Sequence, residues 1–247
     1  MTAERGRGAA GKAAEALGSA AGPDLESAFG AADPTGEPRL ADRAYAALEE
    51  LIVTAALPPG SLWSEALLSE RIGIGRTPVR EALQRLASDH LVVLLRRHGI
   101  RVSDVLVPEQ LLVLDTRREL ERLVSVSAAR RASGAERQSH RQAALQLRAV
   151  GEARDVLRYL RVHFALKRFT CACARNPFAA RALSPLHALS RRFFYVHRDR
   201  FGDLMDVAAV HADLAEAIGR GDAGAAAAAS DAMTGLAVDF TRRIILD

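Results

Sequence analysis

The sequence predicts a mostly α-helical protein in two parts, a short segment of helices closed by a β-hairpin and then a longer helical bundle. Apolar residues recur at helical spacing between residues 40 and 86, and again from residue 107 almost to the C-terminus. Between these stretches, the runs 91–95 and 100–102 are leucine-rich or β-branched, which predicts two strands. Because the second helical stretch is the longest part of the chain, the fold class is mainly α.

The composition is that of a soluble globular protein, with 49% hydrophobic and 26% charged residues among 247. No stretch approaches the roughly 18 uncharged apolar residues that a membrane span needs. The N-terminus also lacks the apolar core of a signal peptide. We therefore expect a cytoplasmic location and no membrane partner. Two cysteines are too few for a disulfide framework, which fits a reducing compartment.

Residues 1–37 differ from the rest of the chain in their composition. They contain 11 alanines and 7 glycines, show little apolar periodicity, and carry a net charge of −3. We expect a disordered tail. Its negative charge argues against a basic arm that grips DNA.

The first domain, predicted at 38–105, opens with three helices. The first begins near Leu40 and is stopped by the sequence Pro58-Pro59-Gly60. The second has Ser64 as its candidate N-cap, and a tight Gly73-Ile74-Gly75 turn ends it. The third is predicted to begin at Thr77-Pro78, with threonine as the cap and proline in the first turn.

Positive charge is concentrated in one part of this domain. Residues 71–101 carry seven arginines against Glu81 and Asp89, a net charge of +5, whereas residues 40–105 together are neutral. Of the 34 basic residues in the chain only two are lysines, which is typical of GC-rich codon usage. The whole-chain charge of +4 therefore indicates little about a partner, but its local density points to a polyanion. The alternative is that these arginines only form an ordinary solvated surface and bind no polyanion.

Helix, helix, tight turn, helix and hairpin is the order of a winged helix-turn-helix DNA-binding domain. Arg76 and Arg80 lie four residues apart and share one face of the third helix, where arginine can bridge the O6 and N7 atoms of guanine. Thr77 at the start of the helix can bind a phosphate. His98 and Gly99 form the predicted hairpin tip, where a small backbone can approach the minor groove.

These residues resemble the DNA-binding domain of the GntR family of bacterial transcription regulators. The resemblance rests on the stretches 57–62 (LPPGSL), 73–86 (GIGRTPVREALQRL) and 96–100 (RRHGI). It implies double-stranded DNA as a partner and the five residues above as contacts. One departure is Gly75, where the family usually has serine or threonine, so that one phosphate contact is expected to be missing.

The second domain, predicted at 106–247, is an all-α bundle. Glycine residues and an Asn-Pro pair separate six predicted helices, and these lie at 107–132, 135–149, 152–174, 177–198, 203–219 and 222–245.

The bundle resembles the FCD effector domain, the fatty-acid-regulator-like branch of the same family. The resemblance rests on 115–121 (DTRRELE), on Asn176-Pro177, and on 211–218 (HADLAEAI) followed by Gly221-Asp222. It implies a homodimer, a palindromic operator and a small-molecule effector.

Many FCD domains hold a divalent metal with one aspartate and three histidines, and here only one of the four positions keeps its type. The positions fall on His163, Lys167, His211 and Met233. A lysine ammonium has no lone pair for a metal and would repel it. We therefore expect no metal and no cofactor.

In place of the metal, Lys167 is expected to supply positive charge to a small organic-acid effector. Arg117 would add a second cation, and His163 and His211 would add hydrogen bonds. Two alternatives stay open. Lys167 could extend to solvent beside an apolar or vestigial pocket, or an atypical metal site could use His163 and His211 with either His187 or His197.

The sequence thus favours a homodimeric, ligand-responsive transcription regulator without enzymatic activity. Repression is the commoner mode of the family. The alternative from another class is a small-molecule-binding or enzymatic helical domain with a vestigial DNA-binding module.

Overall fold

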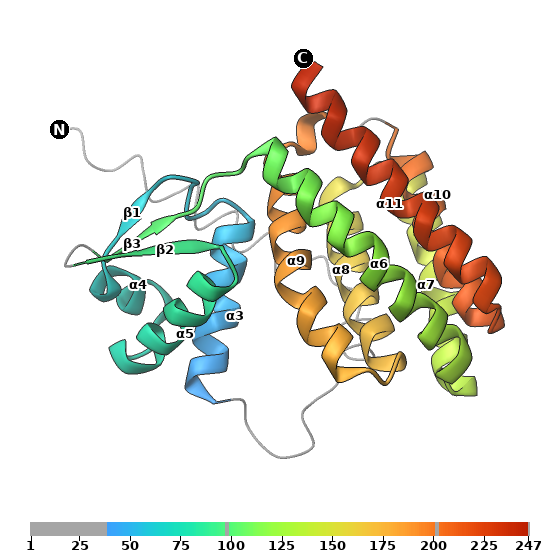
Figure 1. The fold of residues 1–247 in the computed structure, drawn as a ribbon, viewed down its shortest axis with the longest axis horizontal. Helices are drawn as coiled ribbons and strands as arrows, with labels where there is room; N and C mark the ends of the chain where they lie inside the picture. The colour runs from blue at the N-terminus through green and yellow to red at the C-terminus, as the bar shows by residue number, and fades with distance from the viewer. Residues whose placement is uncertain (1–38, 97–98, 201–202, 247) are drawn as a thin grey trace.

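The computed structural model describes residues 39–96, 99–200 and 203–246, and these form two lobes (Figure 1). Helices and a small sheet make up the N-terminal lobe, and helices alone make up the C-terminal lobe. The expected tail at 1–37 lies outside the described residues. The elements of the N-terminal lobe are α3 (Leu40–Val53), β1 (Leu62–Trp63), α4 (Glu65–Ile72), α5 (Arg76–Ser88), β2 (Val92–Leu95) and β3 (Gly99–Val102).

The C-terminal lobe confirms the mostly α-helical class and the order of elements that the sequence predicts. The six predicted helices are present, each with ends within four residues of the predicted ones. They are α6 (Val107–Arg131), α7 (Gly134–Glu152), α8 (Val156–Cys173), α9 (Pro177–Val196), α10 (Leu204–Arg220) and α11 (Ala223–Leu246), with a 3₁₀ turn at Arg198–Arg200 after α9.

The sheet has three strands, whereas the sequence predicted a two-stranded hairpin. The strand order is β1-β3-β2, and both pairings are antiparallel. In the added strand, Leu62 pairs with Arg101 and Trp63 with Ile100. A strand of two residues is too short to produce an alternating pattern, so the sequence signal could not reveal it.

The start of α5 also differs from the prediction. The helix begins at Arg76 with Gly75 as its N-cap, and no side chain caps it. Thr77 and Pro78 therefore lie inside the first turn, and Thr77 is not the cap. The prediction for α4 is confirmed, because the Ser64 hydroxyl accepts a hydrogen bond from the Leu67 backbone N–H.

One apolar core holds the N-terminal lobe together. Leu48 and Ile52 of α3 meet Leu83 and Leu86 of α5, and Ile100 of β3 closes the core from the sheet side. Each of these side chains is almost completely buried. This core fixes α5 beneath the sheet, with its opposite face towards solvent.

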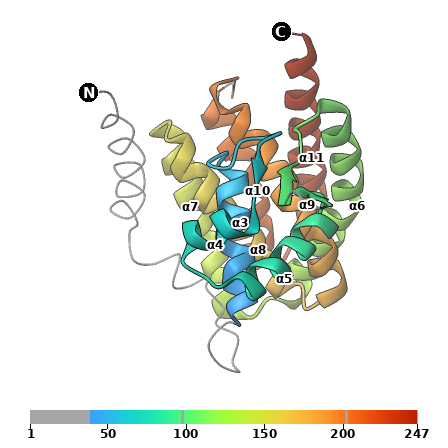
Figure 2. The same ribbon diagram turned by 90° about the vertical axis from the view of Figure 1, so that its left-hand side faces the viewer.

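In the C-terminal lobe, α10 packs along α7 and α11 packs along α6 (Figures 1 and 2). Local capping defines several helix ends. Ser133 and Glu136 form a reciprocal capping box at α7, Asn176 caps α9, and Gly221 ends α10 in the left-handed conformation.

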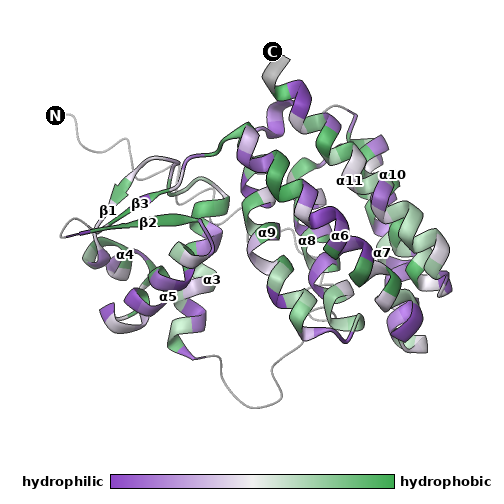
Figure 3. Ribbon diagram, in the orientation of Figure 1, coloured by the Kyte–Doolittle hydropathy of each residue, from purple (hydrophilic) through white to green (hydrophobic). Residues whose placement is uncertain are grey.

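Helix α6 differs from an ordinary amphipathic helix because its buried face is partly polar. Gln110, Arg117 and Glu121 are buried in the same row as Leu114 and Val124. Figure 3 shows hydrophilic stretches along the middle of α6, inside an otherwise mixed bundle. Polar groups at these positions must find partners within the bundle, because leaving them unpaired would be costly.

Candidate functional site

The N-terminal end of α5 is an exposed polar part of the N-terminal lobe. Arg76, Thr77 and Arg80 are all exposed, and the first-turn N–H groups of α5 receive no side-chain cap. Val79 and Leu83 on the other side of the helix are buried in the core. The arrangement directs two guanidinium groups, one hydroxyl and free backbone N–H groups outward from one helix end.

Arg80 is not free in this arrangement, because Glu65 of α4 holds it. Its Nε and Nη2 atoms donate to the two Glu65 carboxylate oxygens at 2.7–3.2 Å. The hydrogen bonds from Arg80 lower the pKa of Glu65. Since the Arg80 side chain is 64% exposed, this pair can exchange with another anion at small cost. Glu65 thus orients Arg80 without burying it.

The wing contributes Gly99 to the described residues, whereas His98 lies outside them. Gly99 pairs with Leu95 at the start of β3 and has a φ of +84°. A Cβ atom there would lie 2.2 Å from the Trp63 carbonyl oxygen. Glycine is therefore required by the contact between β3 and β1, and this structural role stands beside the expected contact with DNA.

A cavity of about 330 Å³ lies within the C-terminal lobe among α6, α8, α10 and α11. Its apolar walls include Leu114, Leu160, Val207, Met233 and Phe240. Of the residues expected to bind an effector, Arg117, His163 and His211 line this cavity. Its volume is at the lower end of the range for small-molecule sites.

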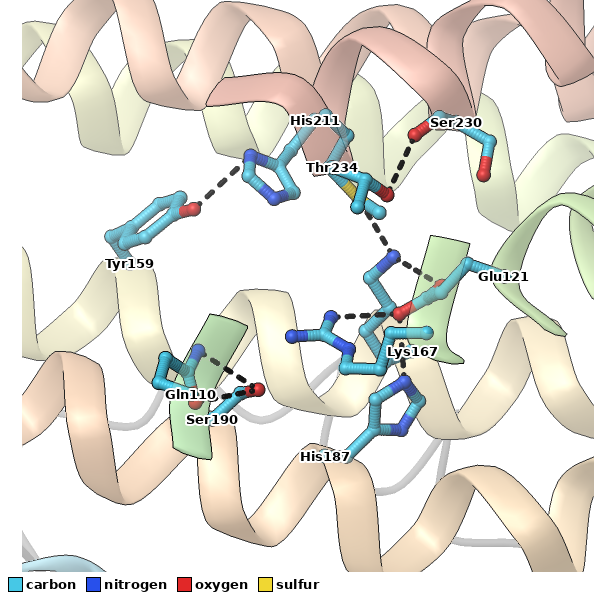
Figure 4. Close-up of polar contacts among 11 residues, drawn as sticks. Gln110, Glu121, Tyr159, Lys167, His187, Ser190, His211, Ser230 and Thr234 are labelled. Atoms are coloured by element: carbon cyan, nitrogen blue, oxygen red, sulfur yellow. Dashed lines mark hydrogen bonds and ion pairs between the residues drawn. The ribbon is translucent and has the colours of Figure 1, made fainter. Parts of the chain in front are cut away.

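Lys167 does not line the cavity and lies in a buried ionic cluster beside it (Figure 4). Glu121 is the centre of this cluster. One carboxylate oxygen accepts from Lys167 Nζ at 2.7 Å, and the other accepts from Arg117 Nη2 and His187 Nε2, each at 2.8 Å. Lys167 Nζ also lies 2.8 Å from the sulfur of Met233. The ammonium expected to meet an effector is therefore already paired within the protein.

Charge pairing determines the direction in which the pKa of Glu121 shifts. Burial would raise the pKa of Glu121, but Lys167, His187 and Arg117 together hold it well below its usual range. Burial lowers the pKa of Lys167, and the Glu121 carboxylate opposes this. The alternative in which Lys167 extends to solvent is wrong, because Lys167 is only 5% exposed.

The two histidines of the cavity are neutral and lie against each other. The ring centroids of His163 and His211 are 4.2 Å apart, and the rings are nearly perpendicular. Nδ1–H of His211 is shared between the Val207 carbonyl at 2.8 Å and the Tyr159 hydroxyl at 3.1 Å. Burial lowers the pKa of His211 to about 4 and takes the pKa of His163 well below its usual value.

The side chains at the four FCD metal positions do not fit a divalent ion. His163 and His211 could donate lone pairs, but Lys167 brings a cation and Met233 a thioether that already contacts it. His187, an alternative ligand, is occupied by Glu121. Within the described parts of the chain, no three histidine, cysteine, aspartate or glutamate side chains gather in a way that could hold a metal.

Sequence reasoning missed Glu121 and His187 as members of this cluster. A signal for Glu121 was present, because Arg117 and Glu121 are four residues apart on the face of α6 that carries Leu114 and Val124. Charged residues in an apolar row indicate a buried pair. His187 carried no such signal, since 66 residues separate it from Glu121.

Helix α9 connects this cluster with the N-terminal lobe. One turn beyond His187, Arg192 donates to the backbone carbonyls of Ser103 at 3.1 Å and Asp104 at 2.9 Å, just after β3. Burial lowers the pKa of Arg192 to about 10, which leaves it charged at neutral pH. Its neighbour Arg191 pairs with Glu49 of α3 at 3.2 Å. We call Arg191 and Arg192 the α9 clamp.

Two family matches together cover most of the described chain. Residues 40–102 match the bacterial regulatory proteins of the gntR family, and residues 112–235 match the FCD domain. The second match alone spans half of the chain. None of the described helices has the length and apolarity needed to cross a membrane.

Known proteins share parts of the sequence and the fold. The chain is 32% identical over 149 residues to a fatty acid metabolism regulator protein from Shewanella halifaxensis, a match covering 55% of this chain and 62% of that protein. It is 33% identical over 87 residues to the HTH-type transcriptional repressor GlaR of Escherichia coli, covering 35% and 40%. Both matches span less than two thirds of the relative's length.

Among solved structures, E. coli McbR/YncC has a similar fold, with a TM-score of 0.74, 18% identity, and coverage of 85% of this chain and 100% of that one. A transcriptional regulator GntR from Rhodococcus sp. RHA1 is more distant, with a TM-score of 0.56, 19% identity, and coverage of 83% and 97%. With a gntR-type winged helix-turn-helix domain followed by an FCD domain, the chain belongs to the GntR family of bacterial regulatory proteins, in its FCD branch.

Proposed function

We propose that this protein is a transcription regulator that binds double-stranded DNA and responds to a small molecule. The N-terminal end of α5 carries this proposal, because its exposed Arg76, Thr77 and Arg80 form a surface suited to the major groove. The wing residues His98 and Gly99 would reach the adjacent backbone or minor groove. The proposal includes no catalytic role and no cofactor, and it places the protein in the cytoplasm, where the DNA is.

The regulator would act as a homodimer on a palindromic operator. Each protomer supplies one α5, so that two copies related by a twofold axis would occupy two half-sites. The domain division in this proposal is 38–105 for DNA binding and 106–247 for effector binding and dimerisation. Repression, the commoner mode of the family, is the proposed direction of control.

The effector would bind in the cavity of the C-terminal lobe, next to Arg117, His163 and His211. Helix α9 supports a route from this cavity to the DNA-binding lobe. His187 contacts Glu121, the partner of Arg117, and little more than one turn later Arg192 of the α9 clamp holds the loop after β3. An effector that prefers one position of α9 would shift the placement of the two recognition helices, and thereby the affinity for the operator.

A mobility-shift experiment with the DNA upstream of the protein's own coding sequence tests this proposal. We expect a specific shift at low salt that survives excess unrelated DNA and that changes when a small organic acid is added. The absence of any shift, with and without acids, would contradict the regulator and favour the rival interpretation, a helical domain with a vestigial DNA-binding module.

A further inference from the structure

The N-terminal tail is the part of the chain that the proposed function leaves unused, and its charges are segregated. Residues 1–12 carry Arg5, Arg7 and Lys12 against one acidic residue. Residues 13–38, which we call the acidic segment, carry no basic residue and have a net charge of −5. Their five carboxylates belong to Glu15, Asp24, Glu26, Asp33 and Glu37. A stretch of one charge sign is suited to a surface of the opposite sign.

The basic stretch around α5 supplies that surface, since its net charge of +5 matches the acidic segment in size. Two of the three arginines of α5 already hold carboxylates of the same chain. Arg80 binds Glu65 at 2.7–3.2 Å, and Arg85 binds Asp42 at 2.6 Å. The third, Arg76, is exposed and forms no ion pair with the part of the chain that the structure describes. Carboxylates are thus partners that this surface accepts, and Arg76 is available for another.

The acidic segment joins the structure directly beside this surface, because α3 packs along α5 (Figure 1). The Arg39 carbonyl accepts the backbone N–H of Asp42 in the first turn of α3, and Asp42 in turn pairs with Arg85. Along the axis of α5, Arg85 and Arg76 lie about 14 Å apart at 1.5 Å per residue. Asp33 precedes Arg39 by six residues, a length of chain that spans up to about 20 Å when extended. Carboxylates of the acidic segment can therefore reach Arg76 within one chain.

A path from this junction to Arg76 crosses the outward face of α5. Arg80 and Arg85 are five residues apart and so lie about 140° apart around the helix axis, on opposite flanks of that face. Thr77 and Gln84 lie between the two flanks, and both are exposed. This is the face proposed to enter the major groove. A segment lying across it would exclude DNA from the same arginines.

We propose that the acidic segment docks on the outward face of α5 in its own chain and competes with DNA for Arg76 and Arg80. Each exposed ion pair is weak on its own. Attachment to the same chain offsets this weakness, because a short tether gives an effective concentration of about millimolar. Salt screens such contacts, so the competition is strongest at low ionic strength. The docking rests on charge and geometry alone, whereas its effect on DNA binding rests on the proposed function.

Photo-cross-linking of the full-length protein tests the docking without DNA. Phe29 lies between Glu26 and Asp33, so Phe29→p-benzoylphenylalanine places a photoreactive ring in the middle of the acidic segment. We expect mass spectrometry to find cross-links within one chain to residues 65–85. A second protein carries the same ring and lacks the five carboxylates, through Glu15→Gln, Asp24→Asn, Glu26→Gln, Asp33→Asn and Glu37→Gln. Its yield of these cross-links should be about tenfold lower, because the attraction to the arginines is lost.

Binding of a random-sequence DNA duplex, followed by fluorescence anisotropy, tests the competition. No operator is needed, because non-specific binding depends on the same positive charge. The protein with the five neutralised carboxylates should bind the duplex about three- to tenfold more tightly than the wild type at about 50 mM salt, and the difference should shrink as salt is added. The matched control neutralises the other end of the tail, through Arg5→Gln, Arg7→Gln and Lys12→Gln, and should show no gain in affinity.

The docking is overturned if the cross-links to α4 and α5 are absent, if they survive neutralisation, or if they join only different copies of the chain. A gain in DNA affinity without these cross-links would show repulsion at a distance and would also reject the docking. Charge-dependent cross-links with no gain in DNA affinity would reject the competition. DNA binding without cross-links rejects the docked tail alone, whereas cross-links in a protein that binds no DNA support the docking and reject the regulator.

Discussion

Arg80 shows how one side chain can be both oriented and available. Its hydrogen bonds to Glu65 fix the guanidinium beside α4, yet most of its surface remains in solvent. A planar guanidinium held in this way can meet O6 and N7 of a guanine with little loss of rotamer freedom. The exchange of Glu65 for a base edge would replace one bidentate acceptor of Arg80 by another.

Replacement of Arg80 by alanine is expected to weaken specific operator binding roughly tenfold to a hundredfold, since one bidentate base contact is lost. Fluorescence anisotropy at constant salt measures this. Arg85→Ala is the control, because Arg85 lies at the far end of α5 and pairs with Asp42. Equal losses in the two variants would show that general charge, and not base contact, explains the effect.

Lys167 leads to a prediction about metals. Its ammonium is bonded to Glu121 and Met233 in the region where metal ligands are found in many FCD domains. We expect the purified protein, after incubation with zinc and dialysis, to retain no stoichiometric metal by elemental analysis. One zinc ion per chain that persists through dialysis would contradict this and would revive the site based on His163 and His211.

At the scale of elements, the sheet depends on close contact between β1 and β3. Gly99 and Gly73 both have positive φ, but only Gly99 is crowded by backbone atoms. Alanine at Gly73 would therefore suffer backbone strain alone, whereas alanine at Gly99 would suffer backbone strain and a steric clash.

Gly73→Ala is expected to lower the free energy of unfolding by about 1–2 kcal/mol through backbone strain alone. Gly99→Ala should lower it further, by about 2–4 kcal/mol in total, because the new methyl group meets Trp63. Urea denaturation of the two variants measures the difference. Similar losses of unfolding free energy in the two variants would mean that the clash with Trp63 does not add to the destabilisation.

Helix α9 is the element that joins both candidate sites. Its residues His187 and Arg192 contact Glu121 at one end and the carbonyls of Ser103 and Asp104 at the other. Ala188 between them is part of the core of the N-terminal lobe. A displacement of α9 therefore alters both contacts together.

Arg192→Met is expected to lower the free energy of unfolding by about 2–4 kcal/mol, since it leaves buried carbonyls without their charged donor. Scanning calorimetry should also show the N-terminal lobe melting earlier than the rest. The exposed Arg181 on the same helix gives the control, and Arg181→Met should melt like the wild type. A wild-type melting curve for Arg192→Met would exclude the contacts of Arg192 as stabilising ones.

At the scale of the whole molecule, histidine burial determines how stability responds to pH. The pKa values of five histidines are lowered, chiefly by burial, and these are His140, His163, His187, His197 and His211. Between the lowered folded values and the unfolded value near 6.5, the unfolded state binds more protons. The contribution of these histidines to the free energy of unfolding is therefore fully present above about pH 6.5, and it is lost as the pH decreases.

The free energy of unfolding should accordingly drop by a few kcal/mol from about pH 7 to about pH 5, with up to about 1.4 kcal/mol per pH unit from each of His140, His163, His187 and His211. The lowered pKa of Glu121 adds a further loss below about pH 4.5. Urea denaturation across this range measures the slope. His211→Gln should show a smaller drop, and a protein equally stable at both pH values would contradict the buried neutral state of these histidines.

The sequence by itself determined what depends on local pattern. Helical spacing predicted the helices of both lobes within a few residues, Ser64 predicted the start of α4, and the arginine density at 71–101 marked the surface around α5. These features depend on residues close together in the chain, so that periodicity and capping chemistry reveal them. The family motifs added the order of the domains.

Only the tertiary structure decided how the buried groups are paired. Glu121 meets Lys167 and His187 across 46 and 66 residues, and two-residue β1 joins β3 across 37 or more. No local pattern encodes such partners. The lysine expected to meet an effector is therefore occupied by Glu121, because a buried ammonium needs a carboxylate and the packing of α6 against α8 provides one.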